Sequence, residues 1–132
     1  MHYSQSPFLE MIGTQLEEWR DGYVRVSLDL KPFHLNRAGV IHGGVIATLL
    51  DHTGGFSGLF TGDPTNRRNG MTLSLTTQYI NQHKSGKVIA IGERISTGRN
   101  IFFSKSEVRT QEGLILATGM GTYRYRGQST ST

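Results

Sequence analysis

The chain has 132 residues, enough for one domain with a real core but too few for separate cofactor and substrate domains. It contains no cysteine, which excludes a disulfide framework or a thiolate metal site, and no apolar run approaches the roughly 18 residues of a membrane span. We therefore expect a soluble, cytoplasmic protein with no membrane partner. A single domain over residues 1–126 should be followed by a disordered polar tail at 127–132.

The formal charge of +4 is unevenly spread, with a balance of −3 over residues 1–30 and of +6 over residues 61–132. A basic C-terminal half attracts anionic partners. Its arginines and lysines are scattered singly along apparent strands and form no nucleic-acid-binding module. An anionic small molecule is therefore expected as the partner, rather than nucleic acid.

The first part of the chain predicts a short helix and a hairpin. Ser6 is a suitable N-cap for a helix that has Pro7 in its first turn and ends at Gly13. Alternating apolar residues then predict strands over 15–19 and 24–30, paired through the turn at Asp21-Gly22.

The remaining elements are one long helix, from about residue 43 to 60, and four consecutive antiparallel strands. The strands are predicted over residues 72–81, 87–97, 101–110 and 114–125, where β-branched and aromatic residues are separated by glycine-containing turns. This pattern favours an α+β fold, with an antiparallel sheet of about six strands wrapped around one central helix. Such a sheet leaves an edge or a face uncovered, which favours at least a dimer.

The candidate active site begins at His42-Gly43-Gly44, directly before the predicted helix. The first amides of a helix have no intrahelical partner, so negative charge developing on a substrate oxygen would be stabilised there. Asp51 follows about two turns along the same helix. We expect the His42 imidazole to cap or pack rather than react, and the backbone amide of Gly43 to be the functional group.

A helical wheel predicts that an apolar arc faces the sheet and that Asp51 lies on an opposite face made of small residues. The apolar arc comprises Val45, Ile46, Leu49, Leu50, Phe56, Leu59 and Phe60, and the small face Ala47, Gly54, Gly55 and Gly58. Interior helical glycines are costly, so this face either packs against a symmetry-related copy or admits a slim ligand beside Asp51. The two interpretations are compatible.

Several other chemistries find no support in the sequence. The histidines show no metal-ligand spacing, so no metal is assigned. Ser57 lacks the second glycine of a nucleophile elbow, because Leu59 stands there. No dinucleotide-binding or phosphate-binding glycine loop is present.

These residues resemble those of the hotdog-fold acyl-CoA thioesterases of the phenylacetate-degradation (PaaI-like) type. The resemblance covers about residues 20–125. It rests on Asn36, Gly39, His42-Gly43-Gly44, Asp51, the segment from Thr72 to Tyr79, Gly86-Lys87-Val88, Gly98-Arg99, Glu107-Val108, Gly113 and Ala117.

The resemblance implies specific roles within a dimer whose two sites lie at the subunit interface. Asp51 would be the general base or nucleophile, and the Gly43 N–H would polarise the thioester carbonyl of the opposite subunit's site. Asn36 would hold the reacting groups and Thr72 would place the attacking water, with His42 and Gly44 completing the motif. Two dimers commonly form a homotetramer. No cofactor is implied, since coenzyme A is part of the substrate.

The resemblance specifies the residues that would contact the coenzyme A and acyl parts of the substrate less fully than the catalytic residues. Relatives often carry Arg-Pro after the aromatic residue of the third main strand, whereas Tyr79 is followed here by Ile80-Asn81. Contacts to the nucleotide phosphates could come instead from Arg67, Arg68, Arg99 and Asn100. The acyl group, which could be aryl, medium-chain or branched, could contact Phe8, Met11, Phe56, Phe60 and Met71.

Two other functions remain open from the sequence. An acyl-thioester hydratase or dehydratase would use His42 with Asp51 as its proton-transfer pair. A non-catalytic acyl-CoA binding module would need neither residue, so an isolated carboxylate on a small-residue face argues against it.

Overall fold

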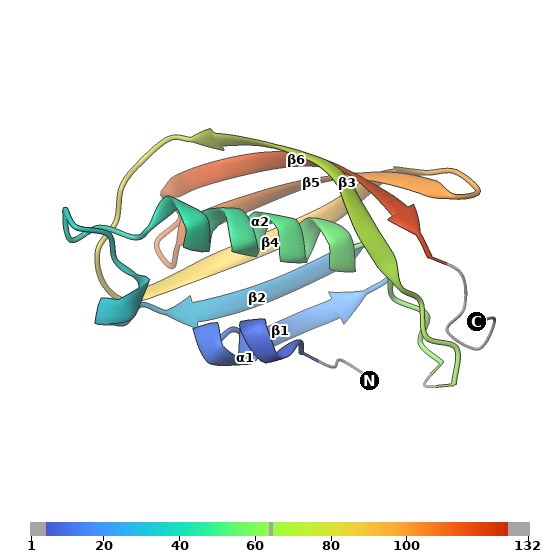
Figure 1. The fold of residues 1–132 in the computed structure, drawn as a ribbon, viewed down its shortest axis with the longest axis horizontal. Helices are drawn as coiled ribbons and strands as arrows, with labels where there is room; N and C mark the ends of the chain where they lie inside the picture. Colours follow the sequence, from blue (N-terminus) through green and yellow to red (C-terminus); the bar gives the residue numbers. More distant parts are fainter. Residues whose placement is uncertain (1–4, 64, 127–132) are drawn as a thin grey trace.

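The computed structural model describes residues 5–63 and 65–126, in which a curved antiparallel sheet wraps around one helix, α2 (Figure 1). The elements in chain order are α1 (Pro7–Ile12), β1 (Gln15–Arg20), β2 (Tyr23–Asp29), the 3₁₀ helix η1 (Pro32–His34), α2 (Gly43–Phe56), β3 (Gly70–Tyr79), β4 (Lys87–Thr97), β5 (Ile101–Thr110) and β6 (Ile115–Tyr125). The predicted tail at 127–132 lies outside the described residues. Among the described helices, none combines the length and apolar character that crossing a membrane requires.

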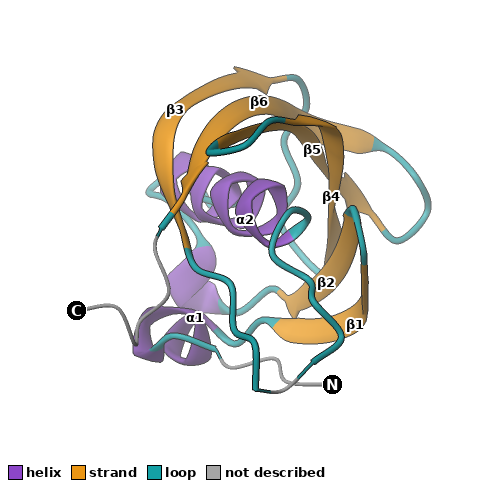
Figure 2. Ribbon diagram, turned by 90° about the vertical axis from the view of Figure 1, so that its right-hand side faces the viewer, coloured by secondary structure: helices purple, strands orange, loops and turns teal. Residues whose placement is uncertain are grey.

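The six strands follow the order β1-β2-β4-β5-β6-β3, and every pairing is antiparallel. The predicted α+β class is confirmed, but chain order does not give the position of β3. This strand follows α2, crosses to the far side and pairs with β6 instead of β4. Figure 2 shows the resulting sheet curled around α2, with β1 and β3 at its two edges.

The predicted N-terminal elements are confirmed. The Ser6 hydroxyl accepts a hydrogen bond from the Leu9 amide at 3.2 Å, and Gly13 ends α1 with a left-handed φ of 99°. The hairpin of β1 and β2 turns through Gly22, whose φ is 80°. A glycine is favoured at both positions because other residues rarely adopt positive φ.

The core lies between α2 and the concave face of the sheet. Ile46, Leu49 and Leu50 of α2 are almost completely buried, as the helical wheel predicted. They belong to one apolar cluster with side chains of β2, β4, β5 and β6, which include Val24, Val26, Leu28, Val88, Val108 and Leu116. Burial of these side chains fixes the position of α2 in the sheet.

The predicted helix is too long, because α2 ends at Phe56 rather than at residue 60. The Ser57 amide makes the last α-helical bond, to the Thr53 carbonyl oxygen at 3.0 Å, and the amides of Gly58 and Leu59 donate three residues back, to Gly55 and Phe56 at 3.2 and 3.1 Å. These tighter backbone bonds replace the α-helical pattern. Phe56 packs against the core and on Trp19 of β1, as predicted, and it also lines a cavity beside the helix together with Leu59.

The small-residue face predicted for α2 is also not one surface. Gly54 and Gly58 are buried against β5 and β6, where an added Cβ would overlap the Tyr123 hydroxyl and the Phe102 ring respectively. These two glycines therefore allow α2 and the turn that follows it to approach their own sheet, and they do not serve a second helix. Asp51 and Gly55 remain on the cavity side.

Gly92 of β4 provides a test of this close approach. A Cβ at this position would overlap the backbone carbonyl oxygen of Thr53, and backbone atoms cannot rotate away. Overpacking of this kind costs about 1–3 kcal/mol, so Gly92→Ala should lower the free energy of unfolding by about 2 kcal/mol in urea titrations. Ser96→Ala, at an exposed position of the same strand, is the control. Equal stability of the two variants would contradict the packing described.

Candidate active site

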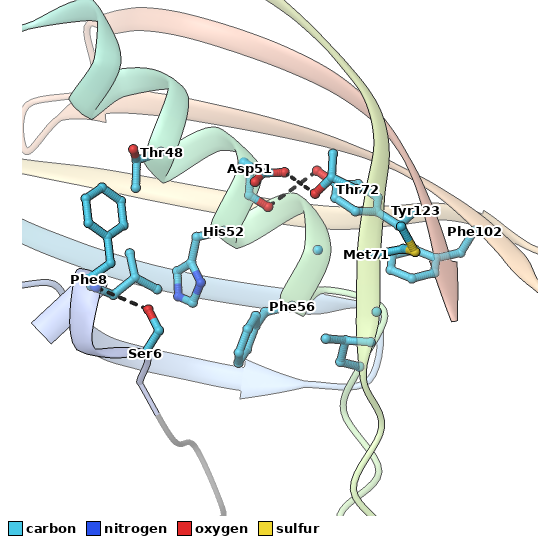
Figure 3. Close-up of a pocket in the computed structure, with 14 residues that line it drawn as sticks. Ser6, Phe8, Thr48, Asp51, His52, Phe56, Met71, Thr72, Phe102 and Tyr123 are labelled. Atoms are coloured by element: carbon cyan, nitrogen blue, oxygen red, sulfur yellow. Dashed lines mark hydrogen bonds between the residues drawn. The ribbon is translucent and has the colours of Figure 1, made fainter. Parts of the chain in front are cut away.

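A cavity of about 310 Å³ lies between α1, α2 and the first residues of β3 (Figure 3). It is lined by Ser6, Phe8, Leu9, Thr48, Asp51, His52, Gly55, Phe56, Leu59, Gly70, Met71, Thr72, Phe102 and Tyr123. The residues from α2 recur every three or four positions, which places them on one stripe of the helix. Most of the wall is apolar or aromatic, and Asp51 is the carboxylate within it.

Asp51 is held in place by a side chain from β3. The Thr72 hydroxyl donates to Oδ1 of Asp51 at 2.7 Å, and Figure 3 shows the two side chains pointing toward each other. The Tyr123 hydroxyl donates to the Asp51 carbonyl oxygen at 3.4 Å. Burial, followed by the nearby Asp51 charge, raises the pKa of Tyr123, so its phenol stays protonated. Asp51 and Thr72, both predicted as site residues, are therefore in direct contact.

His52 makes the neighbouring wall of the cavity uncharged. Only 8% of its surface is exposed, and its ring packs on Phe56 with centroids 4.5 Å apart. Burial lowers the pKa of His52 from 6.5 to about 4. The imidazole is therefore neutral near pH 7.

The first turn of α2 leaves one amide for a ligand. His42 is the N-cap, and its Nδ1 accepts a hydrogen bond from Gly44 N–H at 2.8 Å, which confirms the predicted capping role. The amides of Val45 and Ile46 donate to the His42 carbonyl oxygen. Within the described part of the chain, no acceptor is recorded for Gly43 N–H. Gly43, and not Gly44, therefore offers its amide at the positive end of the helix.

Asn36 shapes the loop that leads into this turn. Its Oδ1 accepts hydrogen bonds from the amides of Ala38 and Val40 at 2.9 and 3.2 Å. A backbone hydrogen bond closes the same loop: the His34 carbonyl oxygen accepts from the His42 amide at 2.8 Å. Asn36 thus orders the backbone before His42, and its side chain lies outside the cavity that contains Asp51.

Tyr79, at the far end of β3, contacts the same turn. Its hydroxyl donates to the Gly43 carbonyl oxygen at 3.0 Å, and its ring lies 3.4 Å from the place where a Cβ of Gly43 would be. The edge strand β3 therefore touches α2 twice, through Thr72 at Asp51 and through Tyr79 at Gly43.

Gly43 and Asp51 are too far apart to act on one carbonyl group within a single chain. They are eight positions apart along α2, which corresponds to about 12 Å at 1.5 Å per residue. The same spacing keeps His42 from Asp51, and the His42 Nδ1 already accepts from Gly44. The proton-transfer pair of a hydratase is therefore not assembled within the chain.

The predicted phosphate-binding residues gather at one end of the sheet. The Arg68 guanidinium lies over the Tyr125 ring at 4.9 Å, and the Tyr125 amide donates to the Asn100 carbonyl oxygen at 2.8 Å. Arg67 and Arg99 are exposed in the adjoining loops. This basic end adjoins the cavity, because Gly70 pairs with Tyr125 and also lines the cavity wall.

Sequence reasoning found part of the cavity wall. Phe8, Phe56 and Met71 line it as predicted, whereas Phe60 packs on Trp19 and Met11 is 71% exposed. Tyr123 and Phe102 were missed, because alternation along a strand does not show which inward side chain lies beside a carboxylate. No cluster of three metal-ligating side chains occurs among residues 5–63 and 65–126.

Comparisons with known proteins agree with this architecture. The family profile described as the thioesterase superfamily matches residues 38–117. A structure of a conserved protein from Pseudomonas aeruginosa is 28% identical, with a TM-score of 0.85 over 92% of this chain and 95% of that one. A hypothetical thioesterase from Streptococcus pneumoniae TIGR4, solved with coenzyme A, is 27% identical, with a TM-score of 0.76 over 88% of each chain.

A curated relative is similar over most of its length. The medium/long-chain acyl-CoA thioesterase YigI of Salmonella typhimurium is 20% identical over 132 residues, covering 89% of this chain and 84% of the relative. The chain belongs to the thioesterase superfamily and is a thioester hydrolase with the hotdog fold.

The buried imidazole of His52 predicts a pH dependence of stability. Above pH 6.5 the His52 imidazole is neutral in both the folded and the unfolded chain. As the pH falls from 6.5 toward 4, it becomes protonated in the unfolded chain but stays neutral in the folded chain. Stability should therefore fall across this window, by at most about 3 kcal/mol for a shift of this size. Urea titrations at pH 7 and 4.5 should show a smaller loss for His52→Gln than for the unmodified protein. Parallel losses would contradict a neutral, buried His52.

Proposed function

We propose that the protein is an acyl-CoA thioesterase in which Asp51 is the general base or nucleophile and Gly43 N–H polarises the thioester carbonyl. One observation carries the proposal: a carboxylate held by Thr72 at 2.7 Å opens onto an apolar cavity. An amide without a recorded acceptor at the start of the same helix supports it. The S. pneumoniae relative solved with coenzyme A supports the choice of thioester.

The chemistry requires these two groups and no cofactor. As a water oxygen bonds to the carbonyl carbon, Asp51 accepts its proton and negative charge moves to the carbonyl oxygen beside Gly43 N–H. The carbon–sulfur bond then breaks, and the coenzyme A thiolate takes up the proton. In the nucleophilic alternative, an Asp51 oxygen bonds to the carbonyl carbon, and the carbon–sulfur bond breaks to release the coenzyme A thiolate. Water then hydrolyses the resulting anhydride, which gives the free acid, restores the Asp51 carboxylate and supplies the proton that the thiolate takes up.

The separation of about 12 Å along α2 implies that two subunits build each site. The edge strand β3 is the surface through which they would pair, since its ladder is open on one side. Large apolar side chains on and next to this strand are 42–57% exposed, namely Met71, Leu73, Tyr79 and Ile80. Pairing of two β3 strands would bury them and continue the sheet.

Symmetry restricts how two β3 strands can pair. Hydrogen-bonded and non-hydrogen-bonded positions alternate in an antiparallel pair, so a two-fold axis must place one residue opposite its own copy. An axis near Leu75, at the middle of β3, would set the end of β3 that carries Thr72 beside the end of the partner's β3 that carries Tyr79. Thr72 contacts Asp51, and Tyr79 contacts Gly43. This pairing would bring Asp51 close to the partner's Gly43.

The basic end of the sheet is proposed to hold the nucleotide phosphates. Arg68 and Asn100 meet around Tyr125, with Arg67 and Arg99 exposed nearby, and this end adjoins the cavity. The proposal also includes the PaaI-like subtype, a homotetramer made of two such dimers and a cytoplasmic location. The motif residues, the apolar β3 edge and the absence of cysteine support these finer assignments.

Removal of the carboxylate charge tests the chemistry. Asp51→Asn keeps the side-chain volume but cannot accept the water proton, so turnover should fall at least about 100-fold. Free-thiol release from a panel of acyl-CoA esters measures it, and thermal unfolding of both proteins checks that the fold is retained. Equal turnover of the variant would contradict the role of Asp51.

Complementation between two variants tests the composite site. Gly43→Pro removes the amide at the first helical position, where proline is favoured, and Gly43→Ala is the control that keeps it. When the Gly43→Pro and Asp51→Asn variants are refolded together, half of the dimers should contain one subunit of each kind. Each mixed dimer has one intact site of two, so the sample should recover about a quarter of the unmodified activity.

A site built within one chain would give a different result. Each subunit of the mixture would then carry one defect, and no activity would return. Size-exclusion chromatography should confirm that subunits have exchanged before the activity is measured.

A further inference from the structure

Gly54 and Gly55, near the end of α2, differ in the structural reason for having no side chain. Gly54 is required by packing, since an added Cβ would overlap the Tyr123 hydroxyl. At Gly55 the nearest atoms to an added Cβ are Cε1 and Cδ1 of Tyr123, at 3.4 and 3.6 Å, which is ordinary contact. Its φ is also not positive. Neither packing nor backbone conformation explains this glycine, although alanine stabilises a helix interior better.

The position of Gly55 suggests what its missing side chain is for. It lines the cavity four residues after Asp51, so both lie on the same face of α2, one turn apart. A thioester carbonyl in reach of Asp51 would extend its acyl group past Gly55. Phe56, Leu59 and Met71 form the wall beyond it.

We propose that Gly55 is a specificity-determining residue, whose missing side chain leaves room in this cavity for an uncharged, apolar acyl group larger than acetyl. This inference rests on the proposed role of Asp51 as the group that meets the thioester. It goes further by assigning the acyl class and the position that admits it.

The charges around the cavity restrict the acyl group. None of the described lining residues is a lysine or an arginine, and His52 is neutral near pH 7. Asp51 would repel an acyl group that ends in a carboxylate, and the apolar wall would not replace its hydration. Hexanoyl-CoA should therefore be preferred over adipoyl-CoA, which has the same chain length and a terminal carboxylate, by at least about tenfold in kcat/KM.

Stability measurements test whether Gly55 is free of a packing requirement. Gly55→Ala should raise Tm by about 2–5 °C, because alanine favours the helix and the added Cβ has room. Gly54→Ala, the same substitution one residue earlier, should lower Tm. A loss of Tm at both positions would show that packing also requires Gly55, and would overturn the proposal.

Enzyme kinetics on the 132-residue chain test the specificity. The ratio of kcat/KM for hexanoyl-CoA to that for acetyl-CoA should fall in Gly55→Ala and by at least about tenfold in Gly55→Leu, which fills the space without a large helix penalty. An unchanged ratio in both variants, or a preference for adipoyl-CoA in the unmodified protein, would overturn the proposal.

Binding separates this inference from the proposed function. In the Asp51→Asn background, calorimetry should show hexanoyl-CoA binding more tightly than free coenzyme A, and adding Gly55→Leu should remove most of that difference. Absence of turnover in the unmodified protein would refute the thioesterase mechanism, yet this binding difference would still stand. If the difference persists with Gly55→Leu, the acyl group lies elsewhere and the specificity role of Gly55 is wrong.

Discussion

The rise of an α-helix is the constraint on which the proposed mechanism depends. Gly43 N–H and the Asp51 carboxylate stand on one helix, eight residues and about 12 Å apart, so one chain cannot bring both to a single carbonyl group. The helix is fixed in a curved sheet by buried Ile46, Leu49 and Leu50, and it cannot bend to close that distance. In the proposed mechanism, a second subunit, with its own helix running in the opposite direction, would supply the missing group.

The edge strand β3 connects this constraint to the assembly. Thr72 orients Asp51 at one end of the strand, and Tyr79 contacts Gly43 at the other end. The same strand presents open backbone groups and exposed apolar side chains to a partner. In the proposed dimer, β3 would both orient the reacting groups and join the subunits, so a change at one end of this strand should affect catalysis and association together.

The sequence predicted local structure better than contacts between distant segments. The limits of β4 and β5 were predicted to the residue, since turn glycines bound regular strand patterns there. The pairing of β3 with β6 was not predictable, because strand order depends on a long crossover. A helical wheel grouped Gly54 with Asp51, whereas the ring of Tyr123, 69 residues later in the chain, separates their environments. The residues of the candidate motif could be grouped from the sequence because they lie close together in the chain.

A crystal structure of the Asp51→Asn variant with unhydrolysed hexanoyl-CoA would test the composite site most directly. The account predicts that the thioester oxygen lies about 2.7–3.1 Å from Gly43 N of one subunit. The side chain at position 51 of the other subunit should face the carbonyl carbon, with the acyl group passing Gly55. A thioester held by position 43 and position 51 of the same chain, or bound away from both, would contradict the account.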